Sequence, residues 1–251
     1  MSIYWCEFPE KCNWKNIAEW TKYTRITTYI TCSSRKDFEK KRNKIKKVCP
    51  NIEINAWPTL SKEEGYWFSG FSSKKSIDKL DQYKGLKIKI DIEPPIPKNY
   101  SIKEAYSWLI INAFRKPKNS KYLQNKILNL TKNTDIIVST FPIPKFIQTN
   151  WGIPINNKLK YNYMYYSSFF NPITLFFYNI YYKYIFLNTI KPDYIAIGLI
   201  GPGIFYNEPI YKRISELKRD IKFLKQYNLI FFNLESISNK PKEWFETTEF
   251  L

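Results

Sequence analysis

The stretch Lys87-Ile88-Lys89-Ile90-Asp91-Ile92-Glu93-Pro94-Pro95 has the pattern of a short β-strand that ends in two carboxylates. Isoleucine occupies every second position, which is the period of a strand, and the two prolines cannot donate to a sheet and so end it. Asp91 and Glu93 are two residues apart, so we expect both to point to one side of the strand tip. Two carboxylates held close together raise the pKa of one of them, which favours a general acid; the alternative is a solvated pair of strand-end acids.

Strand-like and helix-like segments alternate from one end of the chain to the other. We expect eight strands, at residues 3–8, 25–31, 53–57, 86–93, 135–141, 160–166, 194–199 and 229–234. We expect helices at 13–23, 35–48, 74–83, 102–130, 172–187 and 208–226, with a short tail helix near 241–250. The long fourth helix should break near Pro117, Ser33 or Ser34 should cap the second, and the connection after the fifth strand should be irregular.

This alternation predicts an α/β fold, a single (β/α)8 TIM-type barrel formed by residues 1–251. The fifth, seventh and eighth strands are almost entirely apolar, as parallel strands covered on both faces must be. An open doubly wound sheet is the alternative. Its dinucleotide-binding form is disfavoured, because no glycine-rich turn follows the first strand.

Composition excludes several kinds of catalysis. The 251 residues include no histidine, which excludes Ser-His-Asp and Cys-His catalysis and histidine-bound metals. The four cysteines, Cys6, Cys12, Cys32 and Cys49, have no C-x-x-C spacing, so neither a zinc site nor a disulfide framework is indicated. We therefore expect no metal and no organic cofactor, with acid-base chemistry carried by Asp, Glu, Tyr, Lys or Cys.

The formal net charge of +18 is typical of proteins that bind nucleic acid or an anionic surface. The lysines are spread along the whole chain, however, with one dense run at 35–47 inside a helical pattern. We interpret that run as a solvated outer face. Nucleic acid is therefore a partner that the sequence permits but does not favour.

In a parallel barrel the functional groups lie at the carboxyl ends of the strands. Three strand ends carry acids, and aromatic rings and a methionine accompany them at the strand ends and in the long loop at 58–71: Glu7, Trp57, Tyr66, Trp67, Asp91, Glu93, Met164, Tyr166 and Glu235. Aromatic faces stack on sugar rings, and carboxyl groups protonate a leaving oxygen. The pattern thus favours a carbohydrate ligand, with Trp57, Tyr66 and Trp67 either as a sugar platform or as packing of the loop.

Three short segments resemble one enzyme family. Asp91-Ile92-Glu93 resembles the end of the D-x-x-D-x-D-x-E motif of the chitinase-type (family eighteen) glycoside hydrolases. Met164-Tyr165-Tyr166-Ser167 is similar to the M-x-Y-D motif on their sixth strand, and Gly198-Leu199-Ile200-Gly201 is weakly similar to a glycine-containing segment on the seventh. The resemblance implies that Glu93 is the general acid. It implies further that Asp91 orients the substrate acetamido group, whose oxygen is the nucleophile, and that Tyr166 hydrogen-bonds that group.

The chain also departs from those motifs. Leu86 and Lys89 stand where the motif has its earlier aspartates, and Ser167 replaces the aspartate of the sixth strand. Glu7 and Glu235 lie outside the pattern, and either one facing Glu93 would permit a mechanism with two carboxylates. An inactive barrel that binds a glycan or a protein partner is therefore the alternative to a glycosidase, beside the basic nucleic-acid-binding protein.

The remaining expectations concern location and assembly. The first residues enter a strand pattern at once, which predicts a cytoplasmic protein without a signal peptide. The apolar stretch 169–190 is interrupted by Asn, Pro and Lys, so we expect no membrane span there. The aromatic helix at 172–187 is interpreted as core packing or, if exposed, as the contact of a homo-oligomer.

Overall fold

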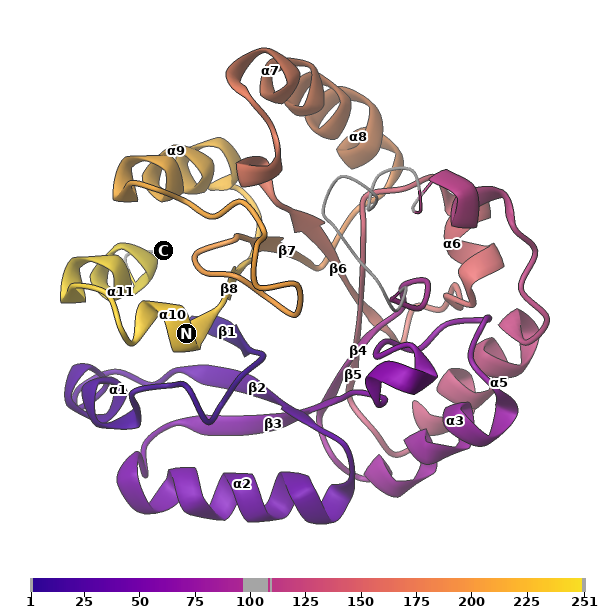
Figure 1. Ribbon diagram of the computed structural model, residues 1–251, viewed down its shortest axis with the longest axis horizontal. Coiled ribbons are helices and arrows are strands. Elements are labelled where there is room, and N and C mark those ends of the chain that lie inside the picture. The colour runs from indigo at the N-terminus through magenta and orange to yellow at the C-terminus, as the bar shows by residue number, and fades with distance from the viewer. Residues whose placement is uncertain (1, 97–107, 109, 250–251) are drawn as a thin grey trace.

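Eight parallel strands form a closed barrel in the computed structural model, which describes residues 2–96, 108 and 110–249 (Figure 1). Each strand pairs with the next in chain order, and β8 pairs with β1 to close the barrel. The predicted (β/α)8 architecture is confirmed. The strands are β1 Ile3–Cys6, β2 Thr27–Cys32, β3 Glu53–Pro58, β4 Ile88–Asp91, β5 Ile136–Thr140, β6 Lys160–Tyr165, β7 Tyr194–Ile197 and β8 Leu229–Phe232.

Helices surround the barrel on the outside (Figure 1). The α-helices are α1 Trp14–Trp20, α2 Arg35–Val48, α3 Lys74–Asp78, α5 Ser120–Leu130, α6 Lys145–Trp151, α7 Pro172–Ile180, α8 Leu187–Thr189, α9 Ile214–Leu224, α10 Leu234–Ile237 and α11 Lys242–Glu249. Short 3-10 segments are η1 Lys62–Glu64, η2 Lys79–Tyr83 and η3 Ser167–Phe169, and a π-helical segment, η4 Tyr181–Phe186, joins α7 to α8.

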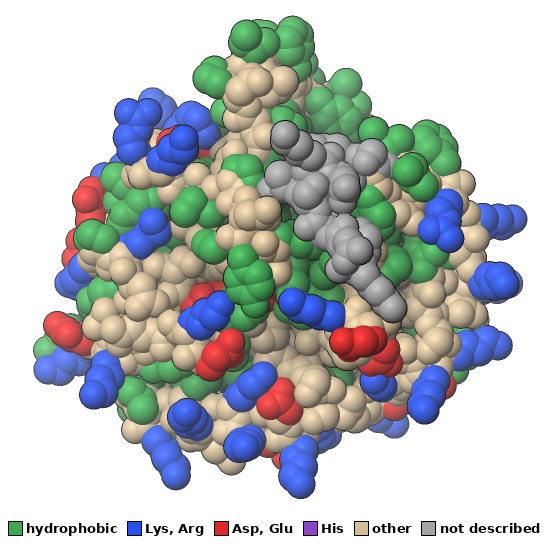
Figure 2. Space-filling view, in the orientation of Figure 1, with side chains coloured by type: hydrophobic (Ala, Val, Ile, Leu, Met, Phe, Trp, Pro, Cys, Tyr) green, Lys and Arg blue, Asp and Glu red, His purple; other side chains and the backbone are tan. Residues whose placement is uncertain are grey.

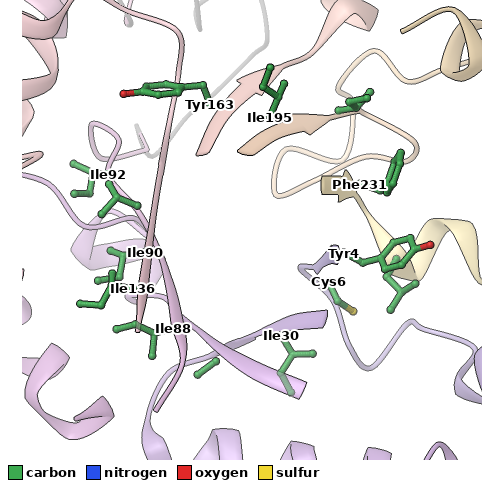
Figure 3. Packing of buried hydrophobic residues seen from close by; sticks show 14 of the residues in the cluster. Tyr4, Cys6, Ile30, Ile88, Ile90, Ile92, Ile136, Tyr163, Ile195 and Phe231 are labelled. Atoms are coloured by element: carbon green, nitrogen blue, oxygen red, sulfur yellow. The ribbon is translucent and has the colours of Figure 1, made fainter. Parts of the chain in front are cut away.

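The alternation along β4 separates two layers of the core. Ile88, Ile90 and Ile92 belong to the large apolar cluster between strands and helices, and Figure 3 shows them along β4 near Ile136. A second, smaller cluster, which includes Trp5 and Trp57, fills the barrel interior. Lys89 lies over those two tryptophan rings, so the charged residues of β4 face inward. The alternation with a period of two in the sequence therefore places Lys89 and Asp91 on the inner face of β4.

Two segments differ from the sequence prediction. The connection after β5, predicted to be irregular, contains helix α6, which ends at Gly152 with a φ of 102°. Prolines on both sides of those seven residues hide the helical pattern. The helix predicted at 208–226 begins only at Ile214, because residues 201–213 form a loop that lies across the end of the barrel (Figure 1). The start of the helix predicted at 102–130 lies partly outside the described residues, and the predicted break near Pro117 is confirmed.

Helix α2 carries the dense basic run on its outer face. Phe38 and Ile45 are buried against the barrel, while most of its Lys and Arg side chains are exposed. Its first turn is fixed by Ser34, whose hydroxyl accepts a hydrogen bond from the backbone N–H of Asp37 at 3.1 Å. Of the two serines that the sequence offered, Ser34 is the cap.

We expect Ser34→Ala to lower the free energy of unfolding by about 1 kcal/mol, because it leaves a backbone donor of the first turn without its acceptor. Urea unfolding of the purified variant measures this loss. Ser33→Ala, one residue earlier on an exposed side chain, is the matched control and should change stability by less than about 0.5 kcal/mol. Equal losses in the two variants would contradict the assignment.

Candidate active site

A cavity of about 80 Å³ lies at the end of the barrel where the strands finish. Four carboxyl groups, one lysine and several aromatic rings line it: Glu7, Asp91, Glu93, Glu208, Lys89, Trp57, Trp67, Phe141, Tyr166, Phe169, Phe205 and Phe232. Carboxylates gathered in a protein of net charge +18 mark this as a specialised site, because the rest of the chain is strongly basic.

Strand β4 supplies the central charged row. Lys89, Asp91 and Glu93 are each at most 3% exposed, and they follow one another at every second position. The Nζ atom of Lys89 lies 2.9 Å from a carboxylate oxygen of Asp91. The same Nζ lies 3.2 Å from the ring centroid of Trp57 and 4.7 Å from that of Trp5. The ammonium group is thus held between an acid and two aromatic faces, which replace the water that it has lost.

The pKa of Lys89 is lowered, because burial disfavours its charged form more than the neighbouring acids favour it. The pKa of Glu93 is raised well above its usual value, first by burial and then by the charge of Asp91. A carboxyl group whose pKa is raised in this way keeps its proton at higher pH, which is the property that a general acid requires. The expectation of a proton-holding carboxyl at the tip of β4 therefore has physical support.

Glu7 follows β1 and faces the same cavity. Its Oε1 atom accepts a hydrogen bond from the hydroxyl of Tyr66 at 2.8 Å, and burial raises its pKa to about 8. A side chain on Gly203 would clash here, since its Cβ would lie 2.8 Å from Glu7 Oε2 and 3.1 Å from Glu208 Oε1. Glycine at 203 therefore lets the loop after β7 close over both acids.

Glu235 has a different position from the cavity acids. Its Oε1 atom accepts hydrogen bonds from the backbone N–H groups of Glu7 and Phe8, at 3.1 and 3.0 Å. It is buried, its pKa is raised to about 7 by that burial, and it is not among the side chains that line the cavity. Glu235 therefore fixes the backbone that carries Glu7 and does not face the cavity itself.

Strand β6 and two loops form the remaining walls. Met164 and Tyr166 line the cavity from the end of β6, and the Tyr166 ring lies 5.9 Å from that of Phe232. Trp67 and Phe205 come from different loops, and their ring centroids are 6.0 Å apart in an edge-on contact. These two rings narrow the site to its small volume, and a ligand of ordinary size would require them to separate.

The fold brings most of the predicted site residues together. Seven of them line the cavity directly: Glu7, Trp57, Trp67, Asp91, Glu93, Met164 and Tyr166. Tyr66 reaches it through Glu7, and Trp57 is a buried wall only 2% exposed rather than part of the covering loop.

Sequence reasoning missed Glu208 and the role of Lys89. Glu208 was hidden at the start of a predicted helix, and it holds its own loop by accepting N–H bonds from Gly203 and Phe205, each at 3.1 Å. Lys89 could have been found from its place on β4, since it shares a face with Asp91 and Glu93. In the part of the chain that the structure describes, no group of three or more Cys, Asp or Glu side chains is arranged to hold a metal ion.

Comparison with known proteins gives a likeness in fold. The chain is similar to a GH18 chitinase from Pseudoalteromonas aurantia, with a TM-score of 0.54 and 12% identity over 98% of this chain and 97% of that one. A family 18 chitinase from Crocus vernus aligns with a TM-score of 0.48 and 11% identity, over 99% of this chain and 98% of that one. At such identities the first likeness shows a shared barrel fold. No protein-family model matches the chain. No curated protein matches it either.

None of the helices in the described residues is both long and apolar enough to span a bilayer.

We expect Lys89→Met to lower the free energy of unfolding by about 3–5 kcal/mol, because it leaves the buried Asp91 carboxylate without its partner. The double variant Lys89→Met/Asp91→Asn removes both charges and should regain most of that loss. Asp91→Asn by itself should lower the free energy of unfolding by less than Lys89→Met does. Burial already lowers the pKa of Lys89, so its ammonium group can lose its proton and remain buried as a neutral amine. Urea unfolding near pH 7 measures all three, and a Lys89→Met variant as stable as the wild type would contradict the ion pair.

Glu7 makes the stability of the protein depend on pH. Its folded-state pKa of about 8 lies above the ordinary value of 4.5, so its contribution is complete below about pH 4.5 and is lost as the pH rises through 8. We therefore expect the free energy of unfolding of Glu7→Gln, which keeps an acceptor for Tyr66, to rise relative to that of the wild type as the pH rises. The change should be a few kcal/mol between about pH 5 and pH 9. Denaturation curves at intervals across that range measure the difference, and a difference independent of pH would contradict the raised pKa.

Proposed function

We propose that this barrel hydrolyses a glycosidic bond, with Glu93 as the proton donor. The observation that carries the proposal is the position of Glu93. It is a buried carboxyl group with a raised pKa at the carboxyl end of β4, and it lines a cavity together with Asp91 and aromatic rings. The fold that the chain shares with a GH18 chitinase supports the same class of chemistry.

In the proposed reaction Glu93 donates its proton to the leaving glycosidic oxygen. As the bond to the anomeric carbon breaks through an oxocarbenium-like transition state, the acetamido oxygen of the substrate attacks that carbon. A water molecule then opens the cyclic intermediate, supplies the new hydroxyl group and returns a proton to Glu93. Tyr166, which directly follows β6, lines the same cavity, and in the proposed reaction it contacts the sugar substituent beside the reacting carbon.

The resemblance of the β4 and β6 motifs to family eighteen favours a sugar that carries an acetamido group as the substrate. In that chemistry the acetamido oxygen is the nucleophile, and Asp91 orients it. Lys89 changes this part of the site, because its ammonium group already occupies a carboxylate oxygen of Asp91 at 2.9 Å. The Nζ atom of Lys89 lies 2.9 Å from each of the two carboxylate oxygens of Asp91, so a substrate acetamido group would have to compete with Lys89 for Asp91.

A second candidate function is a barrel that binds a glycan without cleaving it. The observation that favours it is the same ion pair, together with the small cavity under Trp67 and Phe205. In this alternative Asp91 serves the fold through Lys89 and takes no part in a reaction. The two candidates differ in whether Glu93 is needed for turnover.

We expect the wild-type protein to hydrolyse at least one member of a panel of aryl glycosides that includes N-acetylglucosaminides. Glu93→Gln should reduce kcat on that substrate by about 10²–10⁴-fold, because the amide has no acidic proton to donate. The measurement is release of the aryl alcohol, with circular dichroism to verify that the variant is folded.

Glu19→Gln, on the exposed outer side of α1, is the matched control and should retain full activity. Glu7→Gln distinguishes the mechanisms, because a loss as large as that of Glu93→Gln would indicate a second catalytic carboxylate. Turnover that survives Glu93→Gln would overturn the role of Glu93. Binding of sugars without turnover in the wild type would establish the second candidate instead.

A further inference from the structure

One helix on the outside of the barrel carries a row of exposed apolar side chains. Helix α7, the π-helical segment η4 and α8 follow one another from residue 172 to 189. Ile173, Phe176 and Phe177 are 72%, 62% and 64% exposed, and the row continues through Ile180 and Tyr184. These positions recur every three or four residues, so they form one stripe along the helix. We call it the α7 stripe, and Figure 2 shows hydrophobic side chains over this helix at the edge of the molecule.

A basic groove of about 420 Å³ adjoins the stripe, between this helix and α9. It is lined by four cationic side chains and by no acidic one: Lys183, Arg219, Lys222 and Lys225. Lys183 belongs to the same helical segment as the stripe, which makes the two features continuous. Arg219 pairs with the buried Asp220, whereas the three lysines have no acidic partner within 4.0 Å among the described residues. Lys and Arg side chains also gather over α9 beside the stripe in Figure 2.

Two partners would cover such a stripe, namely a second copy of the chain or a lipid surface. A second copy is disfavoured by charge. Each copy carries +18, and the segment 167–192 contains no Asp or Glu that would neutralise the lysines of its partner. An anionic bilayer surface satisfies both features together, since aromatic and aliphatic side chains enter the region between headgroups and acyl chains while cations meet the phosphates.

We propose that the α7 stripe and the basic groove form a docking surface for an anionic lipid bilayer. The helix lies along the membrane surface, with Phe176 and Phe177 inserted and Lys222 and Lys225 at the level of the headgroups. The attachment is peripheral, and it is independent of the proposed glycosidase function.

The test uses the full chain and sedimentation with vesicles. We expect binding to phosphatidylcholine vesicles that contain about 30% phosphatidylglycerol, weak binding to pure phosphatidylcholine, and a loss of binding as salt rises from about 0.1 to about 0.5 M. Phe176→Ser/Phe177→Ser should weaken binding at least about tenfold through lost insertion. Lys222→Ser/Lys225→Ser should weaken it by a similar factor on the anionic vesicles only.

Two controls match these variants elsewhere on the surface. Tyr23→Ser removes an aromatic ring that is 88% exposed, and Lys36→Ser/Lys40→Ser removes two exposed charges from α2, on the opposite side of the barrel from α7 (Figure 1). Both should bind vesicles as the wild type does, and all variants are checked for folding by circular dichroism.

Three outcomes would overturn the proposal. The first is equal binding of the wild type to neutral and anionic vesicles. The second is a loss of vesicle binding in the control variants as large as the loss in the stripe variants. The third is a wild-type protein that does not bind vesicles and that sediments as a dimer, together with a Phe176→Ser/Phe177→Ser variant that sediments as a monomer. That third outcome would assign the stripe to a second copy.

Discussion

The ion pair between Lys89 and Asp91 is the interaction on which the interior of this barrel depends. A lysine at the centre of a closed barrel loses its hydration, and here a carboxylate at 2.9 Å and the rings of Trp57 and Trp5 replace it. Because the two residues share one face of β4, the pair forms within a single strand and needs no adjustment of the barrel. The pair also acts on Glu93, whose pKa is raised first by burial and then by the charge of Asp91, while the charge of Lys89 partly opposes that rise.

Burial governs the acidic groups that are crowded together in the cavity. Glu7, Glu93 and Glu208 share a cavity, and in each of them burial is the largest cause of a raised pKa. Burial favours the neutral form of each group, and neutral carboxyl groups do not repel one another, so the crowding is tolerated. Glycine at 203 leaves room for the oxygens of Glu7 and Glu208 beneath the loop after β7, whereas a Cβ there would force those side chains to shift.

The outer surface is organised by different physics from the interior. Inside the barrel the charge of Lys89 is paired with that of Asp91, whereas the net charge of +18 comes mainly from lysines spread over the outer helices. On α2 those lysines are a solvated face above buried Phe38 and Ile45. Near α7 they border an exposed apolar stripe, and that combination of apolar and cationic groups is what distinguishes a docking surface from an ordinary basic one.

The sequence by itself determined the barrel and most of the residues at its mouth. Periods of two and of three to four residues are local properties, and the rule that strand ends meet at one face then places Asp91, Glu93, Glu7 and Tyr166 together without knowledge of any contact. A cap at Ser33 or Ser34 and the break near Pro117 were also predictable from the sequence, because caps and prolines act within one turn of chain.

Only the tertiary structure decided which side chains face one another across the barrel. Three contacts join residues that are far apart in sequence. Lys89 lies over aromatic rings of other strands, Glu235 accepts a hydrogen bond from the backbone of Glu7, and Glu208 lines the cavity beside Glu7. The short helix α6 escaped prediction because the prolines on both sides of it hide its helical pattern, and the loop at 201–213 occupies what the sequence predicted as the start of a helix. Patterns along the chain specify which face a side chain takes, but what it meets there depends on the closure of the barrel and the packing of its loops.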